Sequence, residues 1–290
     1  MTLTASILIS TYNRLPLWRR TLWSLAYNRP RDFTFEVVVV DDGSTEDVLG
    51  ELKRYSSQFH WKFVRLDMEA FAKETGLKKF LNNPALSFNV AARHASGSWY
   101  FQEGNEVMAY GRVYDQLMQE TPKEEFSLSF STTLDVPPEV LLALNETGSN
   151  LTPQMVRYCE RWPLANPLFH TDVTNYVSLC SAKLYRELGG YDERYLDGIG
   201  KEDSDFVRRC RAIPGWTDAR NMCRSQAISL HQSHGGRTWY RKQEKETATD
   251  EKWREGERRS KAVWDLWDGT HHNRQPWPWG TVGVLDVVSN

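Results

Sequence analysis

The sequence lacks several features that define whole classes of protein. It has only four cysteines in 290 residues and no Cys-x-x-Cys pair, which excludes a disulfide scaffold. No uncharged apolar run reaches the roughly 18 residues of a membrane-spanning helix, and the first ten residues show no signal-peptide pattern. We therefore expect a cytoplasmic protein with free thiols.

Charge of one sign is also missing. Lys and Arg number 36 and Asp and Glu number 38, so the formal net charge is −2. A general nucleic-acid binder would carry an overall positive field, and this chain leaves room only for a local basic patch. With 40% hydrophobic residues, the chain has the composition of a globular protein large enough for one large α/β domain or two smaller ones around a shared core.

Short apolar runs alternate with helical patterns. The second run contains four consecutive valines, which favour a strand. Alternation of this kind predicts an α/β fold with a doubly wound sheet, in which ligands bind beyond the carboxyl ends of the strands. Gly97 is predicted to cap the helix before it. We expect strands at 6–10, 35–40, 63–66, 99–101 and 176–181, and helices at 17–26, 86–95 and 183–188.

Two regions depart from this alternation. Residues 120–165 are rich in loops and prolines, which suggests an insertion or a lid. Residues 239–267 predict a long charged helix or a pair of helices, and six of the twelve tryptophans fall in the last 52 residues. We expect a catalytic domain at 1–236, with halves at about 1–110 and 111–236, and a Trp-rich extension at 237–290.

Four polar segments carry the candidate chemistry. Residues 10–14, 41–44 and 103–106 each follow a predicted strand, so they are expected at one rim of the sheet. Carboxylate and amide oxygens there suit a nucleotide and a hard divalent cation. In the fourth segment, 198–206, adjacent acids at a helix start could hold and deprotonate a hydroxyl. Each segment could instead be only a polar turn or a helix cap.

The order of these segments resembles a known family. Ser-Ile-Leu-Ile-Ser-Thr-Tyr-Asn-Arg followed by Val-Val-Val-Val-Asp-Asp-Gly-Ser resembles the opening of family 2 and related GT-A-fold glycosyltransferases. Gly-Gly-Tyr-Asp-Glu at 189–193 followed by Gly-Lys-Glu-Asp at 200–203 is similar to a block shared with galactosyl- and N-acetylgalactosaminyltransferase-like members. The resemblance runs from about 5 to 234.

The resemblance implies a nucleotide-sugar donor, usually linked to uridine. It implies that one set of residues holds the nucleotide: Thr11, Tyr12, Asn13, Arg14, Asp41, Asp42 and Asn89. A metal-binding Asp-x-Asp motif maps onto Glu103 and Asn105, with Glu106 as a substitute, and late histidines His231 and His234 are further ligand candidates. Mn²⁺ or Mg²⁺ suits such oxygen-rich ligands.

The resemblance also implies the chemistry. Asp203 matches the catalytic base of inverting members and Glu202 its acceptor-binding neighbour, while Tyr191 and Trp216 are candidates for contacts with a saccharide or other hydroxyl acceptor. The alternative is a catalytically degenerate relative that only binds a nucleotide-sugar. The altered Glu-Gly-Asn motif supports that alternative, and the retained Glu-Asp pair argues against it.

The C-terminal extension leaves its partner open. Residues 237–261 hold nine basic and six acidic residues with interleaved tryptophans. Such a segment could dock on an anionic membrane surface or a nucleic-acid acceptor. It could instead pack on the catalytic domain or on a second subunit. The acids interspersed among the bases favour packing.

Overall fold

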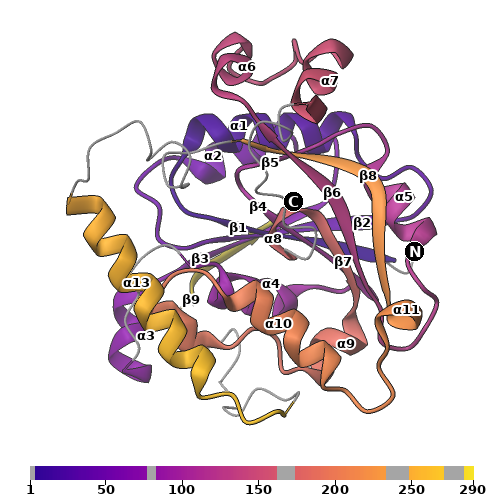
Figure 1. Cartoon of the computed structure of the whole chain (residues 1–290). Coiled ribbons are helices and arrows are strands. Elements are labelled where there is room, and N and C mark those ends of the chain that lie inside the picture. The colour runs from indigo at the N-terminus through magenta and orange to yellow at the C-terminus, as the bar shows by residue number, and fades with distance from the viewer. Residues whose placement is uncertain (1–3, 77–82, 162–173, 233–247, 271–283) are drawn as a thin grey trace.

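The structure is a computed structural model that describes residues 4–76, 83–161, 174–232, 248–270 and 284–290 (Figure 1). The strands are β1 (Ala5–Thr11), β2 (Phe35–Asp41), β3 (Trp61–Leu66), β4 (Trp99–Gly104), β5 (Val107–Ala109), β6 (Leu128–Val136), β7 (Ser178–Ser181), β8 (Met222–Gln232) and β9 (Val284–Ser289). The helices are α1 (Leu15–Tyr27), α2 (Val48–Lys53), α3 (Met68–Thr75), α4 (Ala85–His94), α5 (Val113–Glu120), α6 (Pro138–Ala143), α7 (Pro153–Arg161), α8 (Thr174–Val177), α9 (Ala182–Glu187), the 3-10 helix η2 (Glu193–Asp197), α10 (Glu202–Arg211), α11 (Asp218–Asn221) and α13 (Ala248–Asp265).

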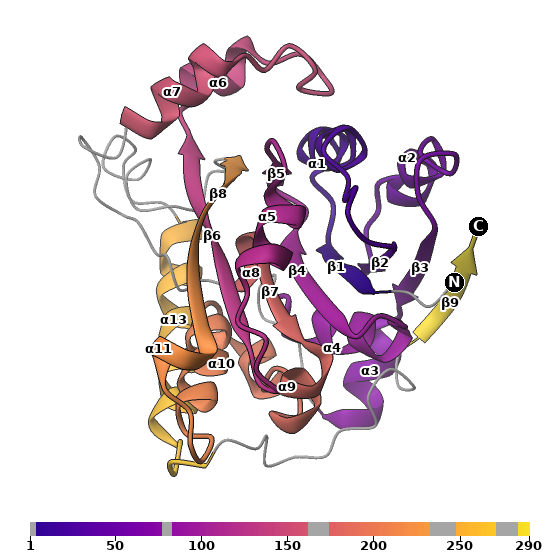
Figure 2. The same ribbon diagram turned by 90° about the vertical axis from the view of Figure 1, so that its right-hand side faces the viewer.

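The described strands form one mixed sheet in the order β5-β8-β6-β7-β4-β1-β2-β3-β9 (Figure 2). Strands β4, β1, β2 and β3 are parallel to one another, whereas β7 and β9 run antiparallel to their neighbours. The predicted α/β class with a doubly wound mixed sheet is confirmed.

Helices cover both faces of the sheet and give it two cores. The valines of β2 are fully buried and alternate between them, with Val38 and Val40 facing one core and Val37 and Val39 the other. A strand sandwiched in this way reads as a continuous apolar run, which is why the sequence reveals it. The first core packs α4, α9 and α10, and the second packs α1, α2 and α5.

Part of the predicted loop-rich insertion is a central strand, so that prediction is wrong for β6. Its polar residues are buried because their hydroxyls bond to one another across neighbouring segments. Ser131 Oγ and Thr133 Oγ1 lie 2.8 and 3.0 Å from Ser229 Oγ in β8. Buried hydroxyls with partners cost little, so a serine-rich stretch can form a core strand. Beyond this strand, α6 and α7 project as a small helical arm (Figure 2).

Two local expectations also change. Residues 176 and 177 end the short helix α8, so the predicted strand begins only at Ser178. Gly97 is not the cap of α4, whose C-cap is Ala95. A Cβ on Gly97 would lie 2.5 Å from the backbone carbon of Ala5, so this glycine allows a close approach to β1.

Helix α13, the described helix of the C-terminal extension, packs on η2 and the residues that follow it. Arg259 of α13 donates to Asp197 of η2 at 2.7 Å, and the Ile199 N–H donates to the Gly256 carbonyl at 3.2 Å. This helix therefore packs against the rest of the chain (Figure 1). Among the described residues, we find no helix with the length and apolarity needed to cross a bilayer.

Candidate active site

The carboxyl ends of three adjacent strands meet at one rim. In the sheet register, Thr11 pairs with Asp41, and Ser10 pairs with both Val40 and Gly104. The segments after β1, β2 and β4 therefore start side by side, as the sequence predicts. This is the edge at which open α/β sheets bind their ligands.

Hydrogen bonds join the first two of these segments. The Asn13 N–H donates to Ser44 Oγ at 2.7 Å, and Asn13 Oδ1 accepts from the Thr45 N–H at 2.9 Å. Asn13 and Arg14 both have left-handed backbones, with φ of 51° and 62°. Non-glycine residues adopt this conformation at a cost of about 1 kcal/mol or more. The bonds to the β2–α2 loop hold a strained turn that points its groups over the rim.

Asp41 is fully buried and paired. Its Oδ2 accepts from Arg65 Nε at 2.9 Å and its Oδ1 from the Ser44 N–H at 3.0 Å. Arg65 is the penultimate residue of β3, and its side chain is about one third exposed. Sequence reasoning did not single out Arg65, although a basic residue at the end of the third strand was the available signal. Beside this pair, Asp42 is buried and its N–H donates to the Thr11 carbonyl at 2.9 Å.

The structure corrects the expected metal ligand Glu103. Its carboxyl is completely buried and accepts a 2.6 Å hydrogen bond from the Tyr114 hydroxyl at Oε2. Oε1 has no hydrogen-bond partner among the residues that the structure describes. Burial raises the pKa of Glu103 to about 8, although the Tyr114 bond opposes the shift. Glu103 is thus a neutral core carboxyl near pH 7, turned away from any ligand on the rim.

Asn105, the second expected ligand, is also committed elsewhere. Its Nδ2 donates to Thr11 Oγ1 at 3.0 Å and to the Asn13 carbonyl at 3.2 Å, and the residue is 2% exposed. The same bond turns the Thr11 side chain, predicted to contact the nucleotide, into the protein. Both side chains therefore position the rim loops, and the expected ligand role of Asn105 is wrong.

Glu106 is the carboxylate that reaches this rim from β4. A Cβ on Gly104 would lie 3.1 Å from the Glu106 carboxyl, so that carboxyl lies over the glycine at the strand's end. Its Oε2 is 3.7 Å from Arg14 Nη1, and its side chain is 18% exposed. A hard divalent cation prefers such an oxygen donor. Glu106, rather than Glu103, fits the metal position that the family implies.

The histidine candidates divide between described and undescribed residues. His231 of β8 is 1% exposed, and its Nδ1 lies 2.8 Å from Asp135 Oδ1. A carboxylate that fixes one ring nitrogen is the usual support of a metal-binding histidine. The next residue, Gln232, donates its N–H to the Glu106 carbonyl at 2.8 Å, so His231 and Glu106 are close along paired strands. His234 lies outside the described residues. The described residues hold no group of three or more His, Cys, Asp or Glu side chains suited to a metal.

The acidic pair begins helix α10. Glu202 is 4% exposed and its Oε2 accepts from Asn83 Nδ2 at 3.0 Å, whereas Asp203 is only half-buried. The two acids differ in exposure although they are adjacent, because successive helical residues face about 100° apart. Asp203 is the member of the pair that can meet a ligand.

Tyr191 and Asn89 do not line a site. They connect the segment that leads to Glu202 and Asp203, here called the acidic corner, to the rest of the core. Tyr191 is fully buried, and its hydroxyl donates to Gln102 of β4 and accepts from the Thr174 hydroxyl. Burial raises the pKa of Tyr191 well above its usual value, and the charges of Asp203 and Glu202 add to the shift. The predicted acceptor contact does not fit this burial, and Tyr191 instead ties the segment before the acids to β4.

Asn89 of α4 is likewise fully buried. Its Nδ2 donates to the Tyr191 carbonyl and to Glu193 Oε1 at 2.9 and 2.8 Å, and its Oδ1 accepts from the Tyr191 N–H at 2.8 Å and the Tyr185 hydroxyl. The amide is saturated by protein groups. Its expected nucleotide contact is wrong, because the residue fixes the Gly-Gly-Tyr corner.

Trp216, the other predicted acceptor contact, follows the far end of α10. A ten-residue helix is about 15 Å long, and this length separates Trp216 from Asp203. The indole N–H of Trp216 donates to Asp218 at 3.1 Å, and the ring packs against the core. The structure does not bring Trp216 to the acidic corner.

Comparisons with known proteins agree with this arrangement. Residues 6–101 match Glycosyl transferase family 2. A validoxylamine A glucosyltransferase from Streptomyces hygroscopicus subsp. jinggangensis is 35% identical over 229 residues, which is 71% of this chain and 51% of the relative. The chain thus spans about half the length of this curated relative.

Solved structures share the fold at low identity. The mannosyltransferase PcManGT from Pyrobaculum calidifontis, in complex with GDP-Man and Mn²⁺, matches with a TM-score of 0.54 and 16% identity, over 92% of this chain and 77% of its own. S. aureus TarS 1-349 in complex with UDP-GlcNAc matches with a TM-score of 0.53 and 16% identity, over 85% and 63%. The family match and the 35% identical relative identify the chain as a member of glycosyl transferase family 2, and the solved structures share its GT-A fold.

Proposed function

We propose that this chain transfers a sugar from a UDP-linked donor to an acceptor hydroxyl, with inversion at the anomeric carbon. The observation that carries the proposal is the half-buried Asp203 at the start of α10, twelve residues after the buried Tyr191, whose hydroxyl donates to Gln102 of β4. In the proposed enzyme, this carboxylate and the donor rim at the ends of β1, β2 and β4 face one cleft. The 35% identical relative, a glucosyltransferase by name, supports a hexose donor.

The nucleotide binds at the ends of β1, β2 and β3. Asp41 is buried and holds Arg65 in place, and the partly exposed guanidinium of Arg65 donates to the base or ribose. Tyr12, Asn13 and Asp42 complete this half of the site. The UDP and UDP-GlcNAc complexes of TarS, which shares the fold, support a uridine nucleotide.

The diphosphate lies over the end of β4. Glu106 and His231 are the described residues that would hold Mn²⁺ or Mg²⁺ there, and PcManGT supports Mn²⁺ as the ion. When bound, such an ion neutralises charge on the departing diphosphate. Arg14, 3.7 Å from Glu106, contributes a fixed positive charge at the same place.

The transfer is a single displacement. Asp203 takes the proton of the acceptor hydroxyl while that oxygen attacks the anomeric carbon from the face opposite the diphosphate. The bond between the anomeric carbon and the phosphate oxygen breaks, and UDP leaves with the bonding electrons. Glu202, held by Asn83, positions the first turn of α10 and does not contact the acceptor. We assign donor binding to about 1–110, acceptor binding to about 111–236, and a separate extension to 237–290.

A thermal-shift panel tests donor binding first. UDP, GDP, ADP and CDP, each with and without Mn²⁺, are compared for the rise in Tm, since a ligand that binds only the folded state stabilises it. The proposal expects the largest rise with UDP plus Mn²⁺. No rise with any of them contradicts it.

Turnover is then measured as UDP release from UDP-glucose, with validoxylamine A as the trial acceptor and water as the background acceptor. Binding without transfer or hydrolysis would favour a degenerate nucleotide-sugar-binding protein, the alternative that the altered Glu-Gly-Asn motif at 103–105 supports. The two candidate functions are thus separated by one pair of assays.

A further inference from the structure

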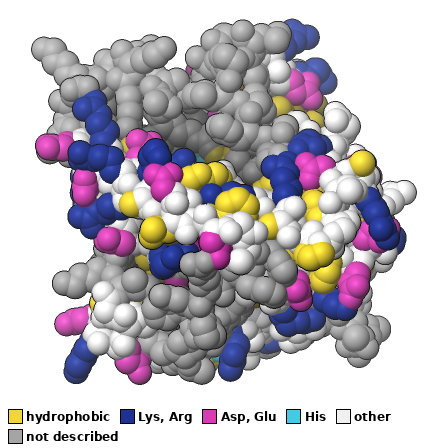
Figure 3. Space-filling model, turned by 60° about the horizontal axis from the view of Figure 1, so that its bottom comes forward, with side chains coloured by type: hydrophobic (Ala, Val, Ile, Leu, Met, Phe, Trp, Pro, Cys, Tyr) yellow, Lys and Arg dark blue, Asp and Glu magenta, His cyan; other side chains and the backbone are white. Residues whose placement is uncertain are grey.

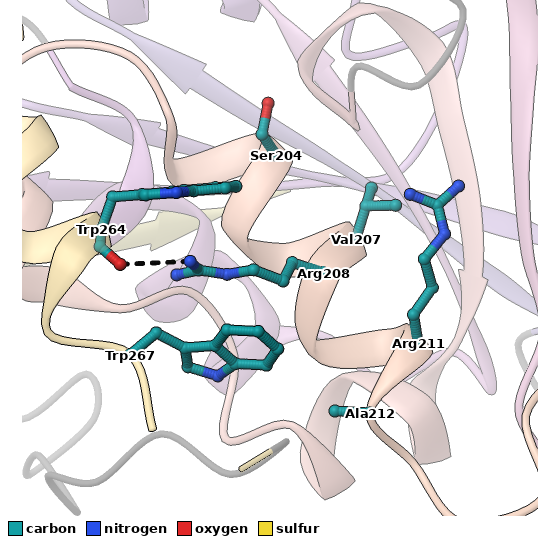
Figure 4. A pocket seen from close by; sticks show the side chains of 7 residues that line it. All are labelled: Ser204, Val207, Arg208, Arg211, Ala212, Trp264 and Trp267. Atoms are coloured by element: carbon teal, nitrogen blue, oxygen red, sulfur yellow. Dashed lines mark hydrogen bonds between the residues drawn. The ribbon is translucent and has the colours of Figure 1, made fainter. Parts of the chain in front are cut away.

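A hollow of about 410 Å³ lies between α10 and the end of α13, next to the proposed base. Its wall on α10 includes Ser204, the residue after Asp203, and continues through Val207 and Arg211, which face the same side of the helix (Figure 4). The opposite wall is formed by Trp264 and Trp267. This volume falls within the range of small-molecule sites.

The two indole rings are held in place from within. The guanidinium of Arg208 lies between them, with its carbon 3.6 Å from the Trp264 ring centre and 4.3 Å from that of Trp267 (Figure 4). Arg208 also donates to the Trp264 carbonyl at 3.1 Å. Lys201, beside the acidic pair, has its Nζ 5.2 Å from the Trp264 ring. The aromatic wall is therefore formed before any ligand arrives, and it begins next to the catalytic corner.

The charges around the hollow are already neutralised. Arg208 pairs with Asp205 of its own helix, and Arg211 pairs with Asp218 at 2.7 Å. The face of the molecule drawn in Figure 3 mixes acidic, basic and apolar side chains. An anionic ligand would therefore gain little net charge here. A neutral ligand with one apolar face and one polar edge is the better fit.

We propose that this hollow is a subsite for a neutral saccharide portion of the acceptor. The C–H groups of a sugar ring pack on Val207 and on those parts of the indoles that Arg208 leaves open to the hollow, while its hydroxyl groups reach Ser204. The ring next along the acceptor then lies toward Asp203, one residue before Ser204. This inference rests on the proposed function and assigns α13 a part in acceptor choice.

The test measures glycan binding to the full chain by calorimetry in the presence of UDP. Maltose, cellobiose, lactose and validoxylamine A are the probes. At least one is expected to bind, and Trp267→Ala is expected to weaken that binding at least tenfold, with Trp267→Phe recovering part of the loss. Trp253→Ala is the matched control, because Trp253 lies on α13 but does not line the hollow.

A second variant fills the hollow without removing an indole. Ala212 lines it, so Ala212→Phe is expected to reduce binding of the same probe while Arg208 keeps its aromatic partners. The Tm measured without ligand identifies any variant that fails to fold. If Trp267→Ala does not fold, binding to Ala212→Phe decides whether the hollow is the subsite.

The outcomes separate the two proposals. If UDP raises the Tm and UDP-glucose is hydrolysed but none of the four glycans binds, the subsite is wrong and the transferase proposal stands. The subsite is equally overturned if a glycan binds equally well to the wild type, Trp267→Ala and Ala212→Phe. If UDP itself does not bind, the proposed function fails.

Discussion

The donor side and the acceptor side of this molecule are built in different ways. On the proposed donor side, the loops after parallel neighbouring strands are connected by bonds such as Asn13 to Ser44 and Arg65 to Asp41, between residues 31 and 24 positions apart. On the acceptor side, one helix start is supported by residues far away in the chain, including Asn83 and Trp264. The donor side therefore follows from strand order, and the acceptor side depends on long-range packing that can vary while the rim stays the same.

The largest expected effect comes from the acceptor side. Asp203→Asn removes the proposed proton acceptor and is expected to slow transfer by about 10²–10⁴-fold, measured as UDP release. The rise in Tm caused by UDP should stay unchanged, because Asp203 does not contact the nucleotide. Asp265→Asn, a change at an exposed carboxylate of α13, is the control. A transfer rate within twofold of the wild type would rule out Asp203 as the base.

The donor side is tested next by two glutamates that differ only in where they point. In the presence of UDP, added Mn²⁺ is expected to raise the Tm. Glu106→Gln should increase the Mn²⁺ concentration that gives half of this rise by about tenfold or more. Glu103→Gln is the matched control and should leave that titration unchanged, since its carboxyl is buried against Tyr114. The opposite result would restore Glu103 as the ligand.

Arg65→Gln should have a smaller effect. A charge-assisted hydrogen bond contributes about 1.5–3 kcal/mol, so the KM for the donor is expected to rise about tenfold or more, with little change in kcat. Arg54→Gln provides the comparison, because Arg54 is an exposed arginine paired with Glu51. If both variants have the same donor KM, Arg65 serves only to neutralise Asp41.

The smallest effect on activity, and a clear one on stability, is expected from Glu103→Gln. The folded pKa of Glu103 is raised from 4.5 to about 8, so its contribution is fully present below pH 4.5 and declines as the pH rises to about 8. One pKa unit corresponds to about 1.4 kcal/mol, so the free energy of unfolding of the wild type should fall by a few kcal/mol over this pH range. Glu103→Gln should abolish that fall. Chemical denaturation at pH 5, 6, 7 and 8 measures it, and equal slopes for variant and wild type would contradict the raised pKa.

The same comparison explains what the sequence could predict. Thr11 and Asp41 were placed correctly on the rim because a buried strand reveals where it ends. Glu103 was mistaken for a ligand because side chains alternate along a strand, so an error of one residue moves a carboxyl from the rim to the core. Glu106 has the same chemistry but lies in the turn after β4, outside the strand.

The predicted acceptor contacts differ from the structure for another reason. Tyr191 and Trp216 flank the acidic block in the sequence, yet one fills the core and the other lies beyond a helix length. The aromatic residues that do approach the block, Trp264 and Trp267, follow it by more than fifty positions. No spacing in the sequence indicates a contact that only the packing of α13 on η2 and α10 creates.

The most direct test of the central claim is a crystal structure of the full chain with UDP and Mn²⁺. The account predicts that the uridine lies against Asp41 and Arg65, and that the diphosphate extends over Gly104 toward the start of α10, with Asp203 facing the open space beyond the β-phosphate. A nucleotide bound elsewhere, or an Asp203 carboxylate turned away from the diphosphate, would contradict it.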